Sequence, residues 1–155
     1  MTLADETLSI IRPIADVFAF LSDHENYARW YPGVVAVTST DRLPPGTVGK
    51  LYSETLRLPS GRQRIFEIRV IKSRTPDIFM TEGTLAPIFP RMEIRLTTKS
   101  ADETVLNLKF LSRNQSAFGR FMIRALVRPA VQRQTRRGLS KLKLLLEPVV
   151  KTAAA

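Results

Sequence analysis

The stretch IRPIADVFAFLSDHENYARWYPGV, residues 11–34, decides the fold. Pro13 suits the first turn of a helix, where its missing N–H group leaves no hydrogen bond unmade. Ser22 and Glu25 have the spacing of a capping box, so a second short helix is expected there, ended by the Pro-Gly pair at 32–33. The first helix has one apolar face, with residues at i, i+3, i+4 and i+7: Ile14, Val17, Phe18 and Leu21.

The segments on either side of this stretch have the pattern of strands. Residues 6–12 predict a first strand, and between residues 34 and 112 apolar and polar residues alternate, as in Phe66-Glu67-Ile68. Turn-forming Pro, Gly, Asp and Ser residues divide this region into six strands joined as hairpins. From about residue 117 to about Val150 the chain predicts a helix.

This order of elements predicts an α+β fold. A curved seven-stranded antiparallel sheet should wrap around the long C-terminal helix, with two short helices after the first strand. The chain of 155 residues has the size of one domain, which we place at residues 1–151, followed by a short tail at 152–155.

The positive charge belongs to the C-terminal segment. Residues 1–116 hold 15 Lys and Arg against 13 Asp and Glu, whereas residues 117–155 hold 9 against Glu147 alone. Such a basic face can meet an acidic membrane surface or an acidic protein partner, or can simply be solvated. Exposed aromatic residues are not interleaved with these charges, so the pattern does not favour nucleic acid.

Several classes of protein are not favoured by the composition. The chain has no cysteine and one histidine, so no zinc or disulfide framework is predicted, and the sequence predicts no metal and no cofactor. The N-terminal residues MTLADETLSI lack the basic start and apolar centre of a signal peptide, and we expect a cytoplasmic protein.

The chain resembles the START-like (SRPBCC) superfamily, which has the helix-grip fold and includes polyketide cyclases/dehydrases and lipid-transfer domains. The resemblance rests on residues 11–34, on GTVGKLY at 46–52, on IFEIRVIKSRTPDIFMTEG at 65–83 and on GLSKLKLLLE at 138–147, in the family's order. It implies a cavity between the curved sheet and the last helix that binds hydrophobic small molecules. Ligands differ widely within one fold, so the resemblance leaves the ligand open.

Two carboxylates lie in apolar strand patterns. Glu54 shares a strand face with Tyr52 and Leu56, and Glu82 shares one with Met80 and Ile78. On inward faces, burial would raise their pKa and make them proton donors or ligand anchors, whereas on outward faces they would be solvated. The predicted ligand-binding residues are Trp30, Tyr52, Glu54, Phe66, Ile68, Met80, Glu82, Met92, Ile94, Phe110, Met122 and Leu126; catalytic residues are left unassigned.

The aromatic cluster at 27–31 admits two interpretations. Trp30 and Tyr31 could anchor the short helix to the edge of the sheet, or they could form part of the rim of a cavity, where an aromatic side chain with a polar group can contact a ligand. His24 lies beside the predicted cap in a surface turn, where we expect a structural or solvent-exposed role.

The C-terminal helix is predicted to kink or break within about four residues of Pro129, because proline removes one helical hydrogen bond and clashes with the preceding turn. The apolar sets before and after it point in different directions when projected at about 100° per residue. The later half should therefore fill the sheet, and residues 118–128 should cover one end of the cavity as a lid with Arg120, Arg124 and Arg128 outward. The apolar set expected to face inward before the break is Phe118, Phe121, Met122, Ala125, Leu126 and Pro129. The alternative is that Pro129 is tolerated and the first half of the helix packs on a neighbouring chain.

Three functions remain open from the sequence. The first is binding or transport of a hydrophobic small molecule or lipid in an internal cavity. The alternative is a cyclase/dehydrase-type enzyme that orients a polyketide-like aromatic substrate and moves protons. The third is an interaction protein that uses its basic C-terminal helix. Buried polar residues on the concave face would favour the enzyme.

Overall fold

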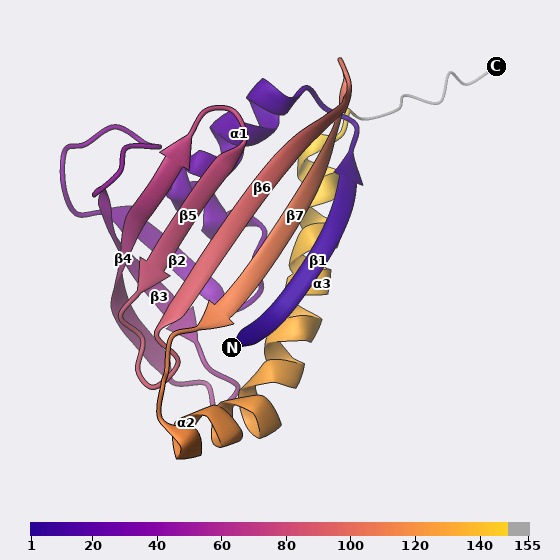
Figure 1. Ribbon diagram of the computed structural model, residues 1–155. Coiled ribbons are helices and arrows are strands. Elements are labelled where there is room, and N and C mark those ends of the chain that lie inside the picture. The colour runs from indigo at the N-terminus through magenta and orange to yellow at the C-terminus, as the bar shows by residue number, and fades with distance from the viewer. Residues whose placement is uncertain (149–155) are drawn as a thin grey trace.

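The computed structural model describes residues 1–148 of the chain. Its seven strands form one antiparallel sheet in the order β1-β7-β6-β5-β4-β3-β2, curved around the C-terminal helix α3 (Figure 1). The predicted fold is confirmed, while the predicted boundary between residues 151 and 152 lies outside the described residues. The strands are β1 (Thr2–Ile10), β2 (Val34–Ser39), β3 (Leu51–Arg57), β4 (Gln63–Arg74), β5 (Ile78–Gly83), β6 (Pro90–Ser100) and β7 (Glu103–Ser112).

The alternating pattern places one apolar face of the sheet on the concave side. Met92 pairs with Phe110 and Ile94 with Leu108 across β6 and β7, and all four side chains are buried. Because successive strand residues point to opposite faces, the charged residues between them lie on the convex side. The concave face therefore forms one side of the protein core.

The first strand begins earlier than predicted. β1 pairs with β7 from Thr2 to Ile10, not from Glu6 to Arg12. The polar residues near its start do not prevent pairing, because Asp5 and Glu6 find charged partners on opposite faces of the sheet. The Asp5 carboxylate lies 3.7 Å from Lys109 Nζ, and the Glu6 carboxylate lies 2.9 Å from Arg136 Nε.

The two short helices lie where the sequence placed them, as α1 (Ile14–Ser22) and the 3₁₀ helix η1 (His24–Arg29). Pro13 is the N-cap residue of α1. The predicted capping box is wrong: Asp23 caps η1 by accepting a hydrogen bond from Glu25 N, and the Glu25 carboxylate instead accepts one from Ser39 N.

The C-terminal helical region is broken as predicted. It consists of α2 (Ala117–Met122), the π-helical segment η2 (Ile123–Val127) and α3 (Arg128–Leu146), with Pro129 in the first turn of α3. Figure 1 shows α2 turned away from the axis of α3 at the lower end of the molecule. The helix ends at Leu146 rather than near Val150, because Pro148 disfavours a helical conformation at Glu147, which is extended.

Only the second part of this region fills the sheet. α3 buries Leu139, Leu142 and Leu146, whereas α2 buries no residue and, in η2, only Ile123 is buried. The apolar set expected to face inward before the break is therefore wrong, since Phe118, Phe121 and Leu126 are exposed. A π-helical turn contains more residues than an α-helical one, so the projection at 100° per residue fails there. The expectation that no exposed aromatic residues lie among the basic charges of this segment is wrong as well, because Phe118 and Phe121 flank Arg120.

Trp30 anchors η1 to the last helix. Its side chain is buried, and a Cβ atom placed on Gly138 of α3 would lie 3.3 Å from Trp30 Cε3 and 3.2 Å from Pro32 Cδ. The absence of a side chain at Gly138 therefore permits the close approach of α3 to η1.

The three tyrosines of the chain are all buried. Tyr27 stacks on Tyr31 with ring centroids 4.9 Å apart, and Tyr31 contacts the Phe110 ring edge-on at 5.3 Å. Burial disfavours the phenolate and raises the pKa of Tyr31 and Tyr52 to about 12, and the pKa of Tyr27 well above its usual value. The phenols are therefore neutral hydrogen-bonding groups at physiological pH.

Replacing Gly138 with Val should destabilise the protein by about 1–3 kcal/mol, because the new side chain forces α3 away from Trp30. Without that clash the substitution would favour the helix slightly. Urea unfolding measures the difference. The control is Ser140→Val on the exposed side of the same helix, which should change stability by less than about 0.5 kcal/mol. Equal stability of the two variants would contradict the close packing.

An alkaline titration followed by tyrosinate absorbance should show no ionisation of the native protein below about pH 11, whereas the urea-unfolded chain titrates near pH 10. Since the folded-state pKa values are raised, the stability that this burial contributes is complete below about pH 10 and is lost as pH rises towards 12. Native tyrosines that titrate near pH 10 would show that the cluster is solvated.

Candidate functional site

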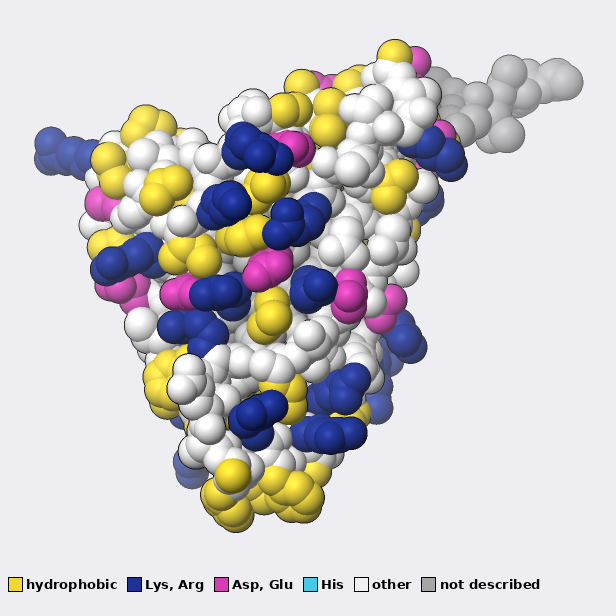
Figure 2. All heavy atoms as spheres, in the orientation of Figure 1, with side chains coloured by type: hydrophobic (Ala, Val, Ile, Leu, Met, Phe, Trp, Pro, Cys, Tyr) yellow, Lys and Arg dark blue, Asp and Glu magenta, His cyan; other side chains and the backbone are white. Residues whose placement is uncertain are grey.

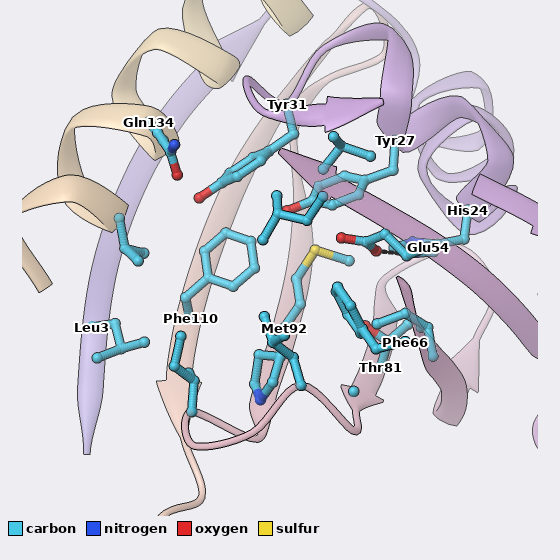
Figure 3. A pocket seen from close by; sticks show the side chains of 18 residues that line it. Leu3, His24, Tyr27, Tyr31, Glu54, Phe66, Thr81, Met92, Phe110 and Gln134 are labelled. Atoms are coloured by element: carbon cyan, nitrogen blue, oxygen red, sulfur yellow. Dashed lines mark hydrogen bonds and ion pairs between the residues drawn. The ribbon is translucent and has the colours of Figure 1, made fainter. Parts of the chain in front are cut away.

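A cavity of about 100 Å³ lies between the concave face of the sheet, η1 and α3 (Figure 3). Its wall is mostly apolar, and the polar side chains in it are few. The apolar lining residues, with Gly83, are Leu3, Val34, Leu56, Phe66, Ile68, Leu85, Ile88, Pro90, Met92, Phe110 and Val131, and the polar or phenolic ones are His24, Tyr27, Tyr31, Glu54, Thr81 and Gln134.

His24 and Glu54 form a buried pair in the cavity wall. The distance from His24 Nε2 to Glu54 Oε2 is 3.2 Å, and the two residues are only 2% and 5% exposed (Figure 3). Their polar atoms have little water to compete with this contact, and a hydrogen bond in such surroundings is stronger than in water.

Local structure explains why both side chains face inward. Glu54 lies on the inward face of β3, where it pairs with Phe66 of β4, and this is one of the two orientations that the sequence left open. His24 is the first residue of η1, directly after the capping residue Asp23, and its ring stacks on Tyr27 at 4.9 Å. The expectation that His24 lies in a surface turn is wrong, because the turn is capped one residue later than predicted and directs the ring into the core.

Two tyrosines add phenolic hydroxyls to the cavity. Tyr31 Oη lies 3.3 Å from Thr135 Oγ1, and that threonine hydroxyl is 2.7 Å from Val131 O. Figure 3 shows the hydroxyl ends of Tyr27 and Tyr31 on the cavity side of their rings. Because the Thr135 hydroxyl donates to Val131 O, the Tyr31 hydroxyl donates to Thr135 and can only accept a hydrogen bond from a bound molecule. The protonated Tyr27 hydroxyl can donate one to a carbonyl or hydroxyl oxygen.

The structure brings together five of the residues that the sequence proposed for ligand binding. Two other predicted residues, Tyr52 and Ile94, are buried in the core but do not line the cavity. The Tyr52 ring contacts the His24 ring edge-on, with centroids 5.3 Å apart. Trp30 packs on α3 instead of forming a rim. The five predicted residues that line the cavity are Glu54, Phe66, Ile68, Met92 and Phe110.

Met80 and Glu82 lie on the opposite face of β5. Their neighbours Thr81 and Gly83 line the cavity, and strand alternation turns Met80 and Glu82 away from it. The Glu82 carboxylate instead pairs with the guanidinium groups of Arg91 and Arg113, the latter at 3.4 Å. The placement of Glu82 in the cavity is therefore corrected.

Met122 and Leu126 do not line the cavity either. Met122 is half-buried and Leu126 is exposed, because the π-helical segment turns Ile123 into the core in their place. Of the segment 118–128 that was predicted to be a lid, Ile123 is buried in the core and Val127 is partly buried against the core. That residues 118–128 act as a lid stays a prediction, which a change in their amide hydrogen exchange on ligand binding would test.

Several cavity residues were missed from the sequence. His24, Tyr27 and Tyr31 were part of the aromatic cluster already singled out, and their spacing along η1 could have suggested a shared inward face. Thr81 could be assigned only with the register of β5, and Gln134 only with the rotation of α3 after η2. No pattern in the sequence alone indicates that Thr81 or Gln134 lines the cavity.

Within residues 1–148, no three His, Cys, Asp or Glu side chains come together in a way that could hold a metal ion. None of the helices described is long and apolar enough to cross a membrane. The compartment and the absence of a cofactor stay predictions.

The pair has two chemical capabilities. Imidazole and carboxylate can hold a polar group of a bound molecule by hydrogen bonds, and they can take a proton from it or return one. The surrounding apolar wall would favour an aromatic or aliphatic body for that molecule.

Known proteins share both sequence features and the fold with this chain. The family described as polyketide cyclase / dehydrase and lipid transport has a sequence model that matches residues 1–147, whereas no curated protein is matched. The di-domain ARO/CYC protein BexL of the BE-7585A biosynthetic pathway is 17% identical with a TM-score of 0.69; the match covers 94% of this chain and 50% of BexL.

Two single-chain structures are similar over most of their own length. A protein from Arthrobacter aurescens is 12% identical with a TM-score of 0.71, covering 97% of this chain and 91% of that one. A START superfamily protein from Mycobacterium smegmatis is 12% identical with a TM-score of 0.60, covering 88% and 97%. At these identities the structures establish the START-like fold, and the sequence match over residues 1–147 shows that this chain belongs to the polyketide cyclase / dehydrase and lipid transport family.

Proposed function

We propose that this protein binds a small, largely apolar molecule in the cavity between the sheet and α3, and that His24 and Glu54 hold a polar group of that molecule. The observation that carries the proposal is the position of this buried pair in a mostly apolar wall. A wall of this kind removes the apolar body of a ligand from water, and the pair fixes its orientation.

The size of the cavity limits the ligand. An apolar cavity of about 150 Å³ holds benzene, and drug-sized ligands occupy pockets of about 300–1,000 Å³. At about 100 Å³ this cavity is smaller than one that holds benzene, so it fits the compact end of a molecule whose remainder lies outside the cavity. A carbonyl or hydroxyl at that end would match the imidazole, the carboxylate and the phenols.

A second candidate is proton transfer of the cyclase/dehydrase type, and the same pair favours it. In a ring closure of this kind, a base removes a proton from the carbon beside a ketone, and the resulting enolate attacks a second carbonyl carbon. The His24–Glu54 pair would accept that proton and return it to the new alkoxide oxygen, while the phenol of Tyr27 would donate a hydrogen bond to the enolate oxygen. Binding would use the pair only to orient the ligand, whereas catalysis would also use it to carry the proton.

Acetophenone is a suitable probe because it combines one aromatic ring with a ketone. We expect it to bind with a dissociation constant of about 0.1–1 mM, and to shift the amide NMR signals of cavity residues. Val131→Phe, which fills the cavity from α3, should weaken this binding by about tenfold or more.

The matched control is Val35→Phe on the exposed side of β2, which should bind acetophenone as the wild type does. Both variants should first be shown to fold by their thermal unfolding. Unchanged binding in a folded Val131→Phe protein would move the binding site away from this cavity.

Proton transfer can be tested separately with the same probe in D₂O. If the pair acts as a base, the protein should accelerate deuterium incorporation into the methyl group of acetophenone, and Glu54→Gln should reduce that acceleration by about 10²–10⁴-fold. Gln keeps the shape of Glu, so acetophenone should still bind to the variant. Binding without any acceleration by the wild type would leave ligand binding as the function and remove the enzymatic candidate.

A further inference from the structure

Three large apolar side chains are exposed at one end of the molecule. Phe118, Phe121 and Leu126 are 76%, 68% and 67% exposed, and they lie within nine residues of the chain. The first two are three positions apart on α2 and share one helix face. Hydrophobic side chains gather at the lower tip in Figure 2, where Figure 1 places α2. Single exposed apolar residues are ordinary, but a cluster that includes two phenylalanines indicates a contact surface.

The tip is a firmly built part of the fold. Ser116 Oγ accepts a hydrogen bond from Gly119 N at 3.0 Å and thereby caps α2. Asn114 Nδ2 donates one to Pro87 O at 2.7 Å, which ties the start of α2 to the β5–β6 connection. On the other side Ile123 is buried in the core. The phenyl groups are therefore held outward by the backbone around them.

The surroundings of the tip are strongly basic. Residues 113–137 contain seven arginines and no Asp or Glu. Arg120 and Arg124, which flank the exposed phenylalanines, form no ion pair with any residue between 1 and 148. A solvent-open hollow at this end is lined in part by Arg91, Arg113 and Arg120, with Glu82 as its acidic residue. Figure 2 shows Lys and Arg side chains directly above the apolar tip.

We propose that this tip, Phe118, Phe121 and Leu126 with the arginines around them, docks the protein on an anionic lipid bilayer. The apolar side chains would enter the boundary between headgroups and acyl chains, and the arginines would contact lipid phosphates. A second copy of the chain fits this surface less well. A symmetric contact through the tip would bring the same unpaired arginines of both copies together, and like charges repel.

Docking in this way would bring part of the cavity wall close to the lipid. Ile88 of that wall lies in the connection before β6, and Ser112 Oγ donates to Ile88 O at 2.7 Å just before α2 begins. Val131, in the first turns of α3, lines the cavity just beyond the tip. The proposal itself requires no cavity ligand, so its test is independent of the proposed function.

The test is sedimentation of the full chain with vesicles made of equal parts phosphatidylglycerol and phosphatidylcholine. The wild type should bind these vesicles, bind vesicles of phosphatidylcholine alone at least about tenfold more weakly, and dissociate as NaCl is raised. The Phe118→Ser/Phe121→Ser protein should bind the anionic vesicles at least about tenfold more weakly than the wild type. Arg120→Gln/Arg124→Gln should also weaken binding and reduce its dependence on salt.

The matched control is Val35→Ser/Ile65→Ser, which removes two exposed apolar side chains from β2 and β4 and should bind as the wild type does. All of these positions are exposed, so the variants should fold. Equal binding by the phenylalanine variant, or equal binding to both kinds of vesicle, would overturn the proposal. Failure of the wild type to bind the anionic vesicles would also overturn it, and a dimer in sedimentation velocity that the phenylalanine variant abolishes would then assign the tip to a second copy of the chain.

Discussion

The packing of α3 across the concave face of the sheet is the constraint on which the rest of this structure depends. A sheet that is apolar on one side must bury that side, and α3 with the two short helices is what covers it. The closest approach occurs at Gly138, against Trp30 of the η1 region. A helix held at that point cannot fill the whole concavity, because the sheet curves away from it. The remaining space is the cavity, lined by the helix, η1 and the strands.

The polar groups of the cavity derive their properties from the same packing. His24 and Glu54 come from η1 and β3, and they meet only because η1 lies against β2 at that end of the sheet. Water is largely excluded from the pair, which strengthens its hydrogen bond and would strengthen its interaction with a bound polar group. The same exclusion keeps the surrounding phenols protonated. One buried cluster could therefore serve both candidate functions, binding and proton transfer.

The π-helical segment divides the C-terminal region between two tasks. After it, α3 places Leu139, Leu142 and Leu146 in the core. Before it, α2 has no buried residue and holds its phenylalanines in solvent beside the arginines. The apolar residues of α2 and those of α3 point in different directions, and the π-helical turn lies where the direction changes. π-helical turns occur often at functional sites, and here the turn lies between the cavity wall and the exposed tip.

The sequence alone determined the order of the elements, the number of strands and the inward faces of β4, β6 and β7. It could do so because period-two alternation, turn residues and Pro129 act locally. It also contained Glu54, Phe66, Ile68, Met92 and Phe110 as cavity candidates. The tertiary structure decided the rest: Glu82 faces outward because of the register of β5, and His24 faces inward because η1 is capped at Asp23. Ile123 is buried in place of Leu126 because a π-helical turn changes the rotation per residue. A one-residue difference in register or cap reverses the direction of a side chain, and the packing of distant segments selects between the two directions.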